Sequence, residues 1–337
     1  MKTFELYNDF VKIELILPKE SNLLILERYL GNYIKIENKT KSALIDKNVD
    51  FKIFVVNSAK SPYLFDYRFI KINDKKCYFK TTELYVDMSN LEDKDWLFLK
   101  RLIIDIVNRL VEQKQGRFFH ASSVVYNGES IMFVGEKGTG KTTAMLYTLL
   151  THQLDYSSNE RTAIIKHDDI IKTYGNPARI NIRAETFKTN KDLKEKFETK
   201  INFEAYEDLF AVKHARDCSE RIQISFEDIS KALNVKVEPV AKLKAICNFI
   251  FDPDVDFKME KVELIEFISE LEKSSIDGVY TDRKILNDLI EVPNSNLDTI
   301  LSQDENINCY NVKYNHTLDF THEIINTILA DSNVRRR

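Results

Sequence analysis

The sequence is poor in several residue types, and each shortage narrows the functions open to it. Its four cysteines lie far apart with no Cys-x-x-Cys pair, which argues against a disulfide framework or zinc site and favours a soluble, cytoplasmic protein. No apolar run reaches the ~18 residues of a membrane span, and the first residues do not resemble a signal peptide. Lys and Arg number 49 against 53 Asp and Glu, and this balance excludes a broadly basic nucleic-acid binder.

Glycine is also scarce and unevenly placed. Only 8 glycines occur in 337 residues, and six of them fall between positions 116 and 175. Glycine is used where the backbone must turn tightly or approach a ligand closely. The crowding therefore predicts that the functional site lies in this part of the chain.

The apolar pattern predicts an α/β protein of more than one domain, because 43% hydrophobic residues in 337 positions can form several packed cores. Residues 1–92 show short strand patterns separated by turns and predict a β-rich α/β module that could capture a peptide substrate. Residues 93–115 have a helical apolar period and predict a connecting helix. We expect a catalytic domain over 116–260 and a helical C-terminal extension over 261–337. Within the former, the charged segment 184–215 predicts helices and a candidate flap over the substrate.

Local signals place several strands near the glycine-rich region. Asn127-Gly128 lies between two apolar runs, which predicts a two-residue hairpin. Residues 243–251 are apolar enough for a buried strand.

Residues 135–142 read Gly-Glu-Lys-Gly-Thr-Gly-Lys-Thr and match the phosphate-loop pattern G-x-x-x-x-G-K-[ST] in full. An apolar strand precedes the loop and a helical pattern follows it, as phosphate binding by backbone N–H groups requires. Lys141 would neutralise the β- and γ-phosphates, and the Thr142 hydroxyl would bind magnesium. The predicted nucleotide-binding residues are Gly135, Glu136, Lys137, Gly138, Thr139, Gly140, Lys141, Thr142 and Thr143.

A second motif lies fifteen residues ahead of the loop, where His120 opens the run His-Ala-Ser-Ser-Val-Val-Tyr-Asn-Gly. A histidine at the start of a strand, then a hairpin, then a phosphate loop resembles the kinase domain of the HPr kinase/phosphorylase family. The resemblance covers about residues 116–180 well and extends weakly to 255. It implies a phosphoenolpyruvate-carboxykinase-like P-loop kinase domain, preceded here by the separate β-rich α/β module.

The resemblance also implies a strand after the loop, here over 156–165, that carries an acidic pair acting as general base and metal partner. A hairpin around residues 166–169 then follows this strand. Asn159 and Glu160 stand at the positions of the acidic pair, which departs from the family pattern. An amide cannot take a proton at neutral pH, so Glu160 is the predicted base and, with Thr142, the predicted metal ligand. His120 could stabilise the terminal phosphate or simply bond a backbone carbonyl, and Arg161 could bind phosphate or form an ordinary salt bridge. The predicted catalytic residues are Glu160, His120, Lys141, Asn159 and Arg161.

The function implied by the resemblance is transfer of a phosphoryl group from ATP, with Mg²⁺, to a serine hydroxyl of a protein or peptide, as in a peptide-tailoring kinase. Relatives of this kind often form homo-oligomers. Two alternatives remain open: a catalytically degenerate nucleotide-binding regulatory module, suggested by Asn159, and an ATPase that drives a partner, with Asp168 at the metal. The run His167-Asp168-Asp169 also suits a solvated turn. Membrane and nucleic-acid partners are not expected.

Overall fold

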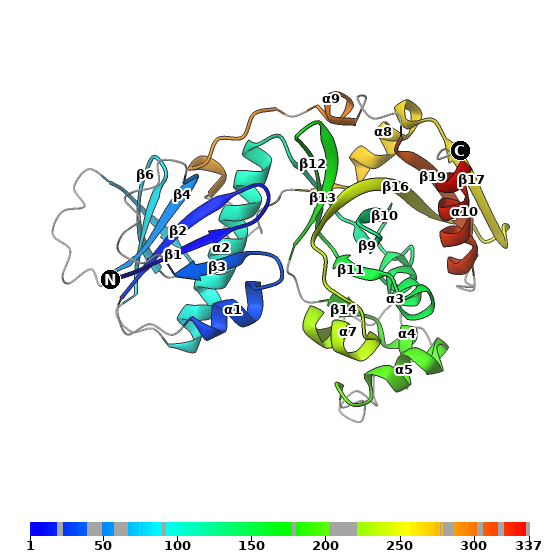
Figure 1. Ribbon diagram of the computed structural model, residues 1–337, viewed down its shortest axis with the longest axis horizontal. Helices are drawn as coiled ribbons and strands as arrows, with labels where there is room; N and C mark the ends of the chain where they lie inside the picture. The colour runs from blue at the N-terminus through cyan, green and yellow to red at the C-terminus, as the bar shows by residue number, and fades with distance from the viewer. Residues whose placement is uncertain are drawn as a thin grey trace. The chain divides into compact units, whose positions relative to one another are not determined.

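The chain is a mixed α/β protein with several β-sheets, and it divides into two compact units (Figure 1). Unit 1 comprises Met1–Gly116 and Asp277–Asn294, and unit 2 comprises Arg117–Ile276 and Ser295–Arg337. The computed structural model describes residues 1–18, 23–38, 49–56, 67–73, 75–88, 92–176, 180–201, 221–276, 278, 286–294, 296–301, 306–315 and 320–334. Within these residues no helix is both long and apolar enough to cross a membrane.

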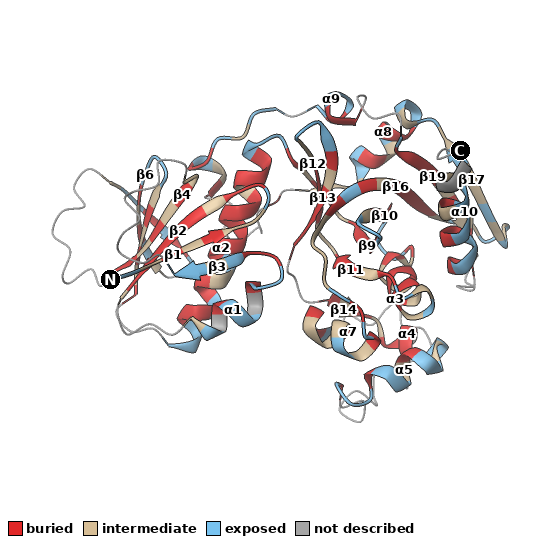
Figure 2. Cartoon of the chain, in the orientation of Figure 1, coloured by how far each residue is buried: buried red, intermediate tan, exposed pale blue. Residues whose placement is uncertain are grey.

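In its described residues, unit 1 contains a seven-stranded sheet with the order β3-β1-β2-β4-β7-β6-β5. Its strands are β1 Lys2–Tyr7, β2 Lys12–Leu17, β3 Lys35–Asn38, β4 Phe51–Val56, β5 Arg68–Ile72, β6 Lys75–Lys80 and β7 Glu83–Asp87. The pairs β2–β4 and β4–β7 are parallel, and the other neighbours are antiparallel. Buried and more exposed residues alternate along β1, β4 and β7, because successive side chains of a strand point to opposite faces (Figure 2).

The described residues of this unit include the helices α1 Leu24–Leu30 and α2 Asp93–Gln113, which contact each other. A capping box starts α2, with the Glu92 backbone N–H donating to the Asp95 carboxylate. The apolar period predicted this helix correctly, and Trp96, Leu99 and Ile103 are buried. The helix belongs to unit 1 and ends at Gln113, just before the boundary between the units at Gly116. An apolar period shows that a helix has a buried face, but it does not show which part of the chain covers that face.

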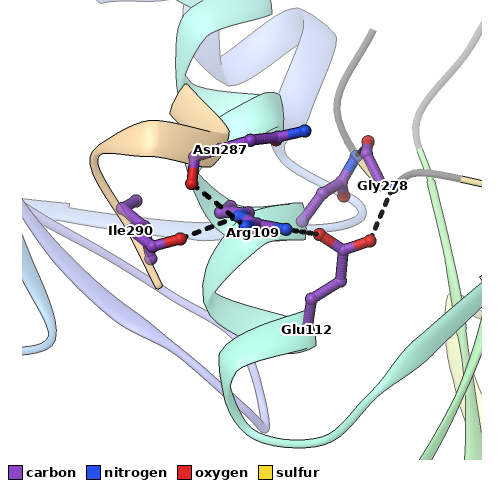
Figure 3. A network of polar contacts seen from close by, with 6 residues as sticks. Arg109, Glu112, Gly278, Asn287 and Ile290 are labelled. Carbon is purple, nitrogen blue, oxygen red and sulfur yellow. Dashed lines mark hydrogen bonds and ion pairs between the residues drawn. The ribbon is translucent and has the colours of Figure 1, made fainter. Parts of the chain in front are cut away.

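A polar network on α2 holds the returning segment 286–294 in unit 1 (Figure 3). The Arg109 guanidinium donates to the carbonyl oxygens of Ile290 at 2.9 Å and Asn287 at 3.2 Å. It also pairs with the Glu112 carboxylate at 3.1 Å, and Glu112 accepts the Gly278 N–H at 2.7 Å. One carboxylate therefore neutralises a mostly buried guanidinium and anchors the chain where it re-enters the unit.

Unit 2 is built on a second sheet, which has ten strands in the described residues. The order is β11-β9-β10-β16-β13-β12-β8-β18, with β19 on β16 and β17 on β19. The strands are β8 Arg117–Phe119, β9 Ser122–Tyr126, β10 Glu129–Gly135, β11 Asp155–Ser158, β12 Thr162–His167, β13 Ile170–Gly175, β16 Val240–Phe251, β17 Phe257–Val262, β18 Ser275–Ile276 and β19 Asn308–Tyr314. β10, β16 and β19 run parallel. A separate two-stranded sheet pairs β14 Ile180–Ile182 with β15 Ile222–Ile224.

Helices contribute to the cores on both faces of this sheet. The described helices of unit 2 are α3 Lys141–His152, α4 Ala184–Thr189, α5 Lys191–Phe197, α7 Phe226–Leu233, α8 Leu264–Lys273, α9 Leu297–Leu301 and α10 Thr321–Val334. Met132 and Val134 of β10 join a core with residues of α8 and α9. Phe133 lies between them and faces the other way, with its ring edge-to-face with Phe249, which contacts Phe320 just before α10. The strand that leads to the phosphate loop is therefore buried on both faces.

Several predicted elements of unit 2 are present, and others differ. Both hairpins occur, between β9 and β10 and between β12 and β13. The single strand predicted over 156–165 is instead two strands, β11 and β12, which pair with different neighbours. The extension 261–337, predicted to be helical, also carries β18 and β19 and part of unit 1. Helices α4 and α5 occupy the start of the predicted segment 184–215, and residues 202–215 lie outside the described residues.

We expect Glu112→Ala to lower the free energy of unfolding of unit 1 by about 2 kcal/mol, because it leaves the Arg109 guanidinium mostly buried without its anion. Trp96, the only tryptophan, is buried in α2, so its fluorescence in urea reports on this unit. The control is Lys94→Ala, which removes an exposed ion pair with Glu92 and should change little. Equal effects of the two substitutions would contradict the anchoring role of Glu112.

Candidate functional site

The segment 135–142 joins the end of β10 to the start of α3, as the sequence predicts. Gly135, Gly138 and Gly140 have φ values of 135°, 95° and 83°, a region that side chains with a Cβ rarely adopt. A Cβ on Gly135 would also lie 2.5 Å from the carbonyl oxygen of Phe249 on the neighbouring strand β16. The tight curvature of this loop therefore depends on its glycines.

Lys141, the first residue of α3, folds its side chain back beneath the loop. Its ammonium donates to the carbonyl oxygens of Gly135 and Glu136, both at 2.8 Å, and the residue is only 7% exposed. Burial lowers the pKa of Lys141 to about 8, because the charged form is partly removed from water. The loop thus contains a positive charge that is poorly compensated by the surrounding protein.

Contacts from other elements fix the loop and the first turn of α3. The Thr139 hydroxyl donates to the Glu136 carbonyl at 2.9 Å, and the Tyr314 hydroxyl of β19 donates to the Thr139 carbonyl. The hydroxyls of Thr143 in α3 and Thr186 in α4 lie 3.3 Å apart. Glu136, Lys137 and Gly138 form the exposed part of the loop. The loop is therefore anchored at both ends, with its middle open to solvent.

Asn159 connects this loop to the neighbouring strand β9. Its side-chain oxygen accepts hydrogen bonds from the hydroxyls of Thr142 at 2.9 Å and Ser122 at 2.7 Å. The residue is 1% exposed, and its buried Nδ2 has no hydrogen-bond partner. The structure therefore brings together Thr142 and Asn159, two of the predicted polar residues, although they lie 17 positions apart in the sequence.

Glu160 lies in the bend that separates β11 from β12. Its φ of 73° is left-handed, which is uncommon for a residue with a side chain and is found at sites where the backbone is constrained. Its carboxylate accepts a hydrogen bond from the Asn181 amide at 2.8 Å. Sequence reasoning did not identify Asn181, because its partner lies 21 residues away and no local pattern marks it.

His120 and Arg161 lie beside the same bend. The His120 Nδ1 is 3.3 Å from the backbone carbonyl oxygen of Glu160. Burial, and then the charge of Lys141, lower the pKa of His120, so the neutral imidazole is favoured near neutral pH. The charge of Arg161 acts on the same imidazole in the same direction. The carbonyl contact expected for a structural histidine is present.

Asp168 and Asp169 occupy the turn between β12 and β13, at the opposite end of β12 from Glu160. Their side chains are 83% and 94% exposed and contact His167 and Lys166 of the same hairpin. Both have left-handed φ values, which aspartate tolerates in tight turns. This location agrees with the solvated-turn interpretation of Asp168.

The oxygen atoms near the loop suit a magnesium ion that is held jointly with phosphate. The described residues contain no cluster of three His, Cys, Asp or Glu side chains able to hold a metal by themselves. Magnesium, however, commonly takes one or two protein oxygens and completes its shell with phosphate and water. The Thr142 hydroxyl and Asn159 Oδ1 converge at 2.9 Å, so the donor chemistry fits such an ion, with one neutral ligand in place of a carboxylate.

Comparison with known proteins gives little beyond these residues. No protein-family model matches the chain, and no curated protein matches it. Among solved structures, it is similar to the Hpr(Ser) kinase/phosphatase from Coxiella burnetii, with 9% identity and a TM-score of 0.32, over 65% of this chain and 92% of that chain. A similarity this weak carries no argument about fold or function, so the proposals below depend on the residues of this chain.

We expect Gly135→Ala to destabilise unit 2 by about 3 kcal/mol or more, because its Cβ would meet the Phe249 carbonyl and its φ is unfavourable. The matched control is Gly128→Ala in the β9–β10 turn, where φ is 76° but no atom lies within 4 Å of the new Cβ. That change should lower the free energy of unfolding by only about 1 kcal/mol. Thermal unfolding followed by circular dichroism measures both. Similar losses for the two variants would show that the contact with β16 does not constrain the loop.

Proposed function

We propose that unit 2 binds ATP and Mg²⁺ and transfers the terminal phosphoryl group to a hydroxyl, most simply that of a serine, on a protein or peptide. The observation that supports this proposal is the phosphate loop itself, with the buried Lys141 ammonium bonded to its first two carbonyl oxygens. Phosphoryl transfer needs little covalent chemistry from the protein, and positioning with charge neutralisation supplies most of the acceleration.

In this proposal the loop amides and the N-terminus of α3 surround the phosphates, and the Lys141 ammonium exchanges its two carbonyl partners for phosphate oxygens. Thr142 and Asn159 supply the oxygen atoms that would hold Mg²⁺. The metal, when bound, neutralises charge on the phosphates. Each of these groups acts on the nucleotide, and none of them needs to be chemically changed.

Glu160 is the proposed general base, accepting the proton of the attacking hydroxyl. Its carboxylate is held by Asn181, which restricts the directions in which the group can point. His120 lies next to it, and its neutral imidazole uses its single N–H, at Nδ1, on the Glu160 carbonyl oxygen, so in this proposal it fixes the bend that carries the base. Glu160 is the one carboxylate in the bend between β11 and β12.

A regulatory nucleotide-binding module is the second candidate, and one observation favours it. The buried Asn159 occupies the position between Thr142 and Ser122 where a carboxylate would give stronger metal binding. A protein of this kind would bind nucleotide without turning it over. The third interpretation, an ATPase with Asp168 at the metal, is disfavoured because Asp168 lies in an exposed turn at the far end of β12.

We expect Lys141→Ala to weaken ATP binding about a hundredfold, equivalent to about 3 kcal/mol, because the loop then lacks its buried cation. Isothermal titration calorimetry with ATP measures the loss. Lys191→Ala, which removes an exposed lysine at the start of α5, is the charge-matched control and should bind ATP like the unmodified protein. Unchanged binding in Lys141→Ala would exclude the loop as the nucleotide site.

The reaction is tested by incubating the protein with radiolabelled ATP, Mg²⁺ and a library of serine-containing peptides. We expect labelled peptide from the unmodified protein and a loss of about a hundredfold or more in Glu160→Gln, since a general base contributes about 10²–10⁴ to the rate. Asp168→Asn should retain full activity. The reverse pattern would support the ATPase arrangement, and ATP binding with neither labelled peptide nor hydrolysis would support the regulatory module.

A further inference from the structure

A polar pair on the short strand β14 reaches the candidate site from outside the main sheet. Ile180 and Ile182 are buried at 0% and 1% exposure, whereas Asn181 and the residue after the strand, Arg183, are partly exposed. Side chains alternate along a strand, so Asn181 and Arg183 project from the same face. Two residues that no motif marks are therefore presented in one direction.

Both side chains reach groups of the candidate site. Asn181 donates to the Glu160 carboxylate at 2.8 Å. A guanidinium nitrogen of Arg183, Nη2, lies 3.4 Å from the position that a Cβ on Gly138 would take, so this cation lies against the exposed middle of the phosphate loop. The proposed base is thus contacted by Asn181 of β14, and the loop by Arg183, the residue just after that strand.

The backbone that carries Arg183 is well fixed relative to the loop. β14 pairs with β15, and the Arg183 carbonyl accepts the Thr186 N–H at 3.0 Å at the start of α4. Thr186 in turn lies 3.3 Å from Thr143 of α3, hydroxyl to hydroxyl. The next residue, Ala184, is buried. Arg183 is therefore held at the loop by the start of α4, which also contacts α3, the helix that follows the loop.

We propose that Arg183 binds the terminal phosphate of the nucleotide and makes the site selective for triphosphates over diphosphates. This inference rests on the proposed function, because it takes the loop to be the nucleotide site. The inner phosphates are enclosed by the loop amides and by Lys141 beneath them. The terminal phosphate must instead lie toward Glu160, where the attacking hydroxyl is deprotonated, and this is the side on which Asn181 and Arg183 project.

The chemistry of the side chain suits this role. A guanidinium remains charged at all physiological pH values and presents paired N–H donors that match two phosphate oxygens. A lysine could supply the charge but not the paired geometry. The Arg183 guanidinium lies against the exposed part of the loop. We therefore expect it to contact the γ-phosphate, which ADP lacks.

The test compares the binding of ADP and of the non-hydrolysable ATP analogue with a β,γ-imido bridge, by calorimetry with Mg²⁺. The unmodified protein should bind the triphosphate analogue at least about tenfold more tightly than ADP, since charge-assisted hydrogen bonds of this kind are worth about one to two orders of magnitude. In Arg183→Gln the analogue should lose about tenfold in affinity, while ADP affinity stays within about twofold. Arg183→Lys should restore part of the preference.

Arg101→Gln, the same substitution at an exposed arginine of α2, is the control and should leave both affinities unchanged. Circular dichroism verifies that each variant is folded, and Arg183→Lys gives the comparison if Arg183→Gln does not fold. Equal weakening of both nucleotides, or an unchanged preference, would overturn the assignment. If the unmodified protein binds neither nucleotide, both the proposed function and the assignment of Arg183 are wrong. If Arg183→Gln loses the preference for the triphosphate but the unmodified protein phosphorylates no peptide, the kinase activity is rejected and the role of Arg183 in binding is supported.

Discussion

The parallel pairing of β10 with β16 is the constraint on which the site depends. Gly135 lies in register with Phe249, at a separation too small for any side chain on the glycine. This close approach holds the last residue of β10 in the sheet while its φ of 135° turns the chain out of the strand. The loop therefore leaves at the carboxyl end of a buried strand, and α3 returns over the sheet in contact with β9 and β10. In this way the sheet positions Thr142 to meet Asn159.

Local chemistry made part of this arrangement predictable from the sequence. The glycine and lysine spacing of the phosphate loop, the Asn127-Gly128 turn and the apolar period of α2 each depend on residues close together in the chain. For such features the amino-acid types act through nearby backbone geometry, and the structure has them where the sequence predicted. The candidate site was partly predictable for the same reason, since Lys141 and Thr142 belong to one continuous motif.

The remaining features depend on partners distant in the sequence. The segment 156–165 has the composition of a single strand, but β11 pairs with β9 and β12 with β8, and the chain must bend at Glu160 to reach both. β19 joins the sheet next to β16 from a part of the chain with mostly helical signals. Asn181 reaches Glu160 only because β14 folds back toward the loop. Such pairings follow from the topology of the whole unit, which periodicity in a single segment does not contain.

The charges around the loop are compatible with the proposed binding of a nucleotide, even though Asn159 replaces a carboxylate. Lys141 is buried and its pKa is lowered, and its charge, together with burial, also lowers the pKa of His120. Arg183 adds a cation at the loop, and Glu160, which Asn181 holds, is the acidic side chain of the bend. A carboxylate at position 159 would partly neutralise Lys141 in the nucleotide-free protein, whereas the amide leaves the positive potential in place. The buried cation lowers folding stability, and under the proposed function this electrostatic deficit would favour the binding of a polyanion.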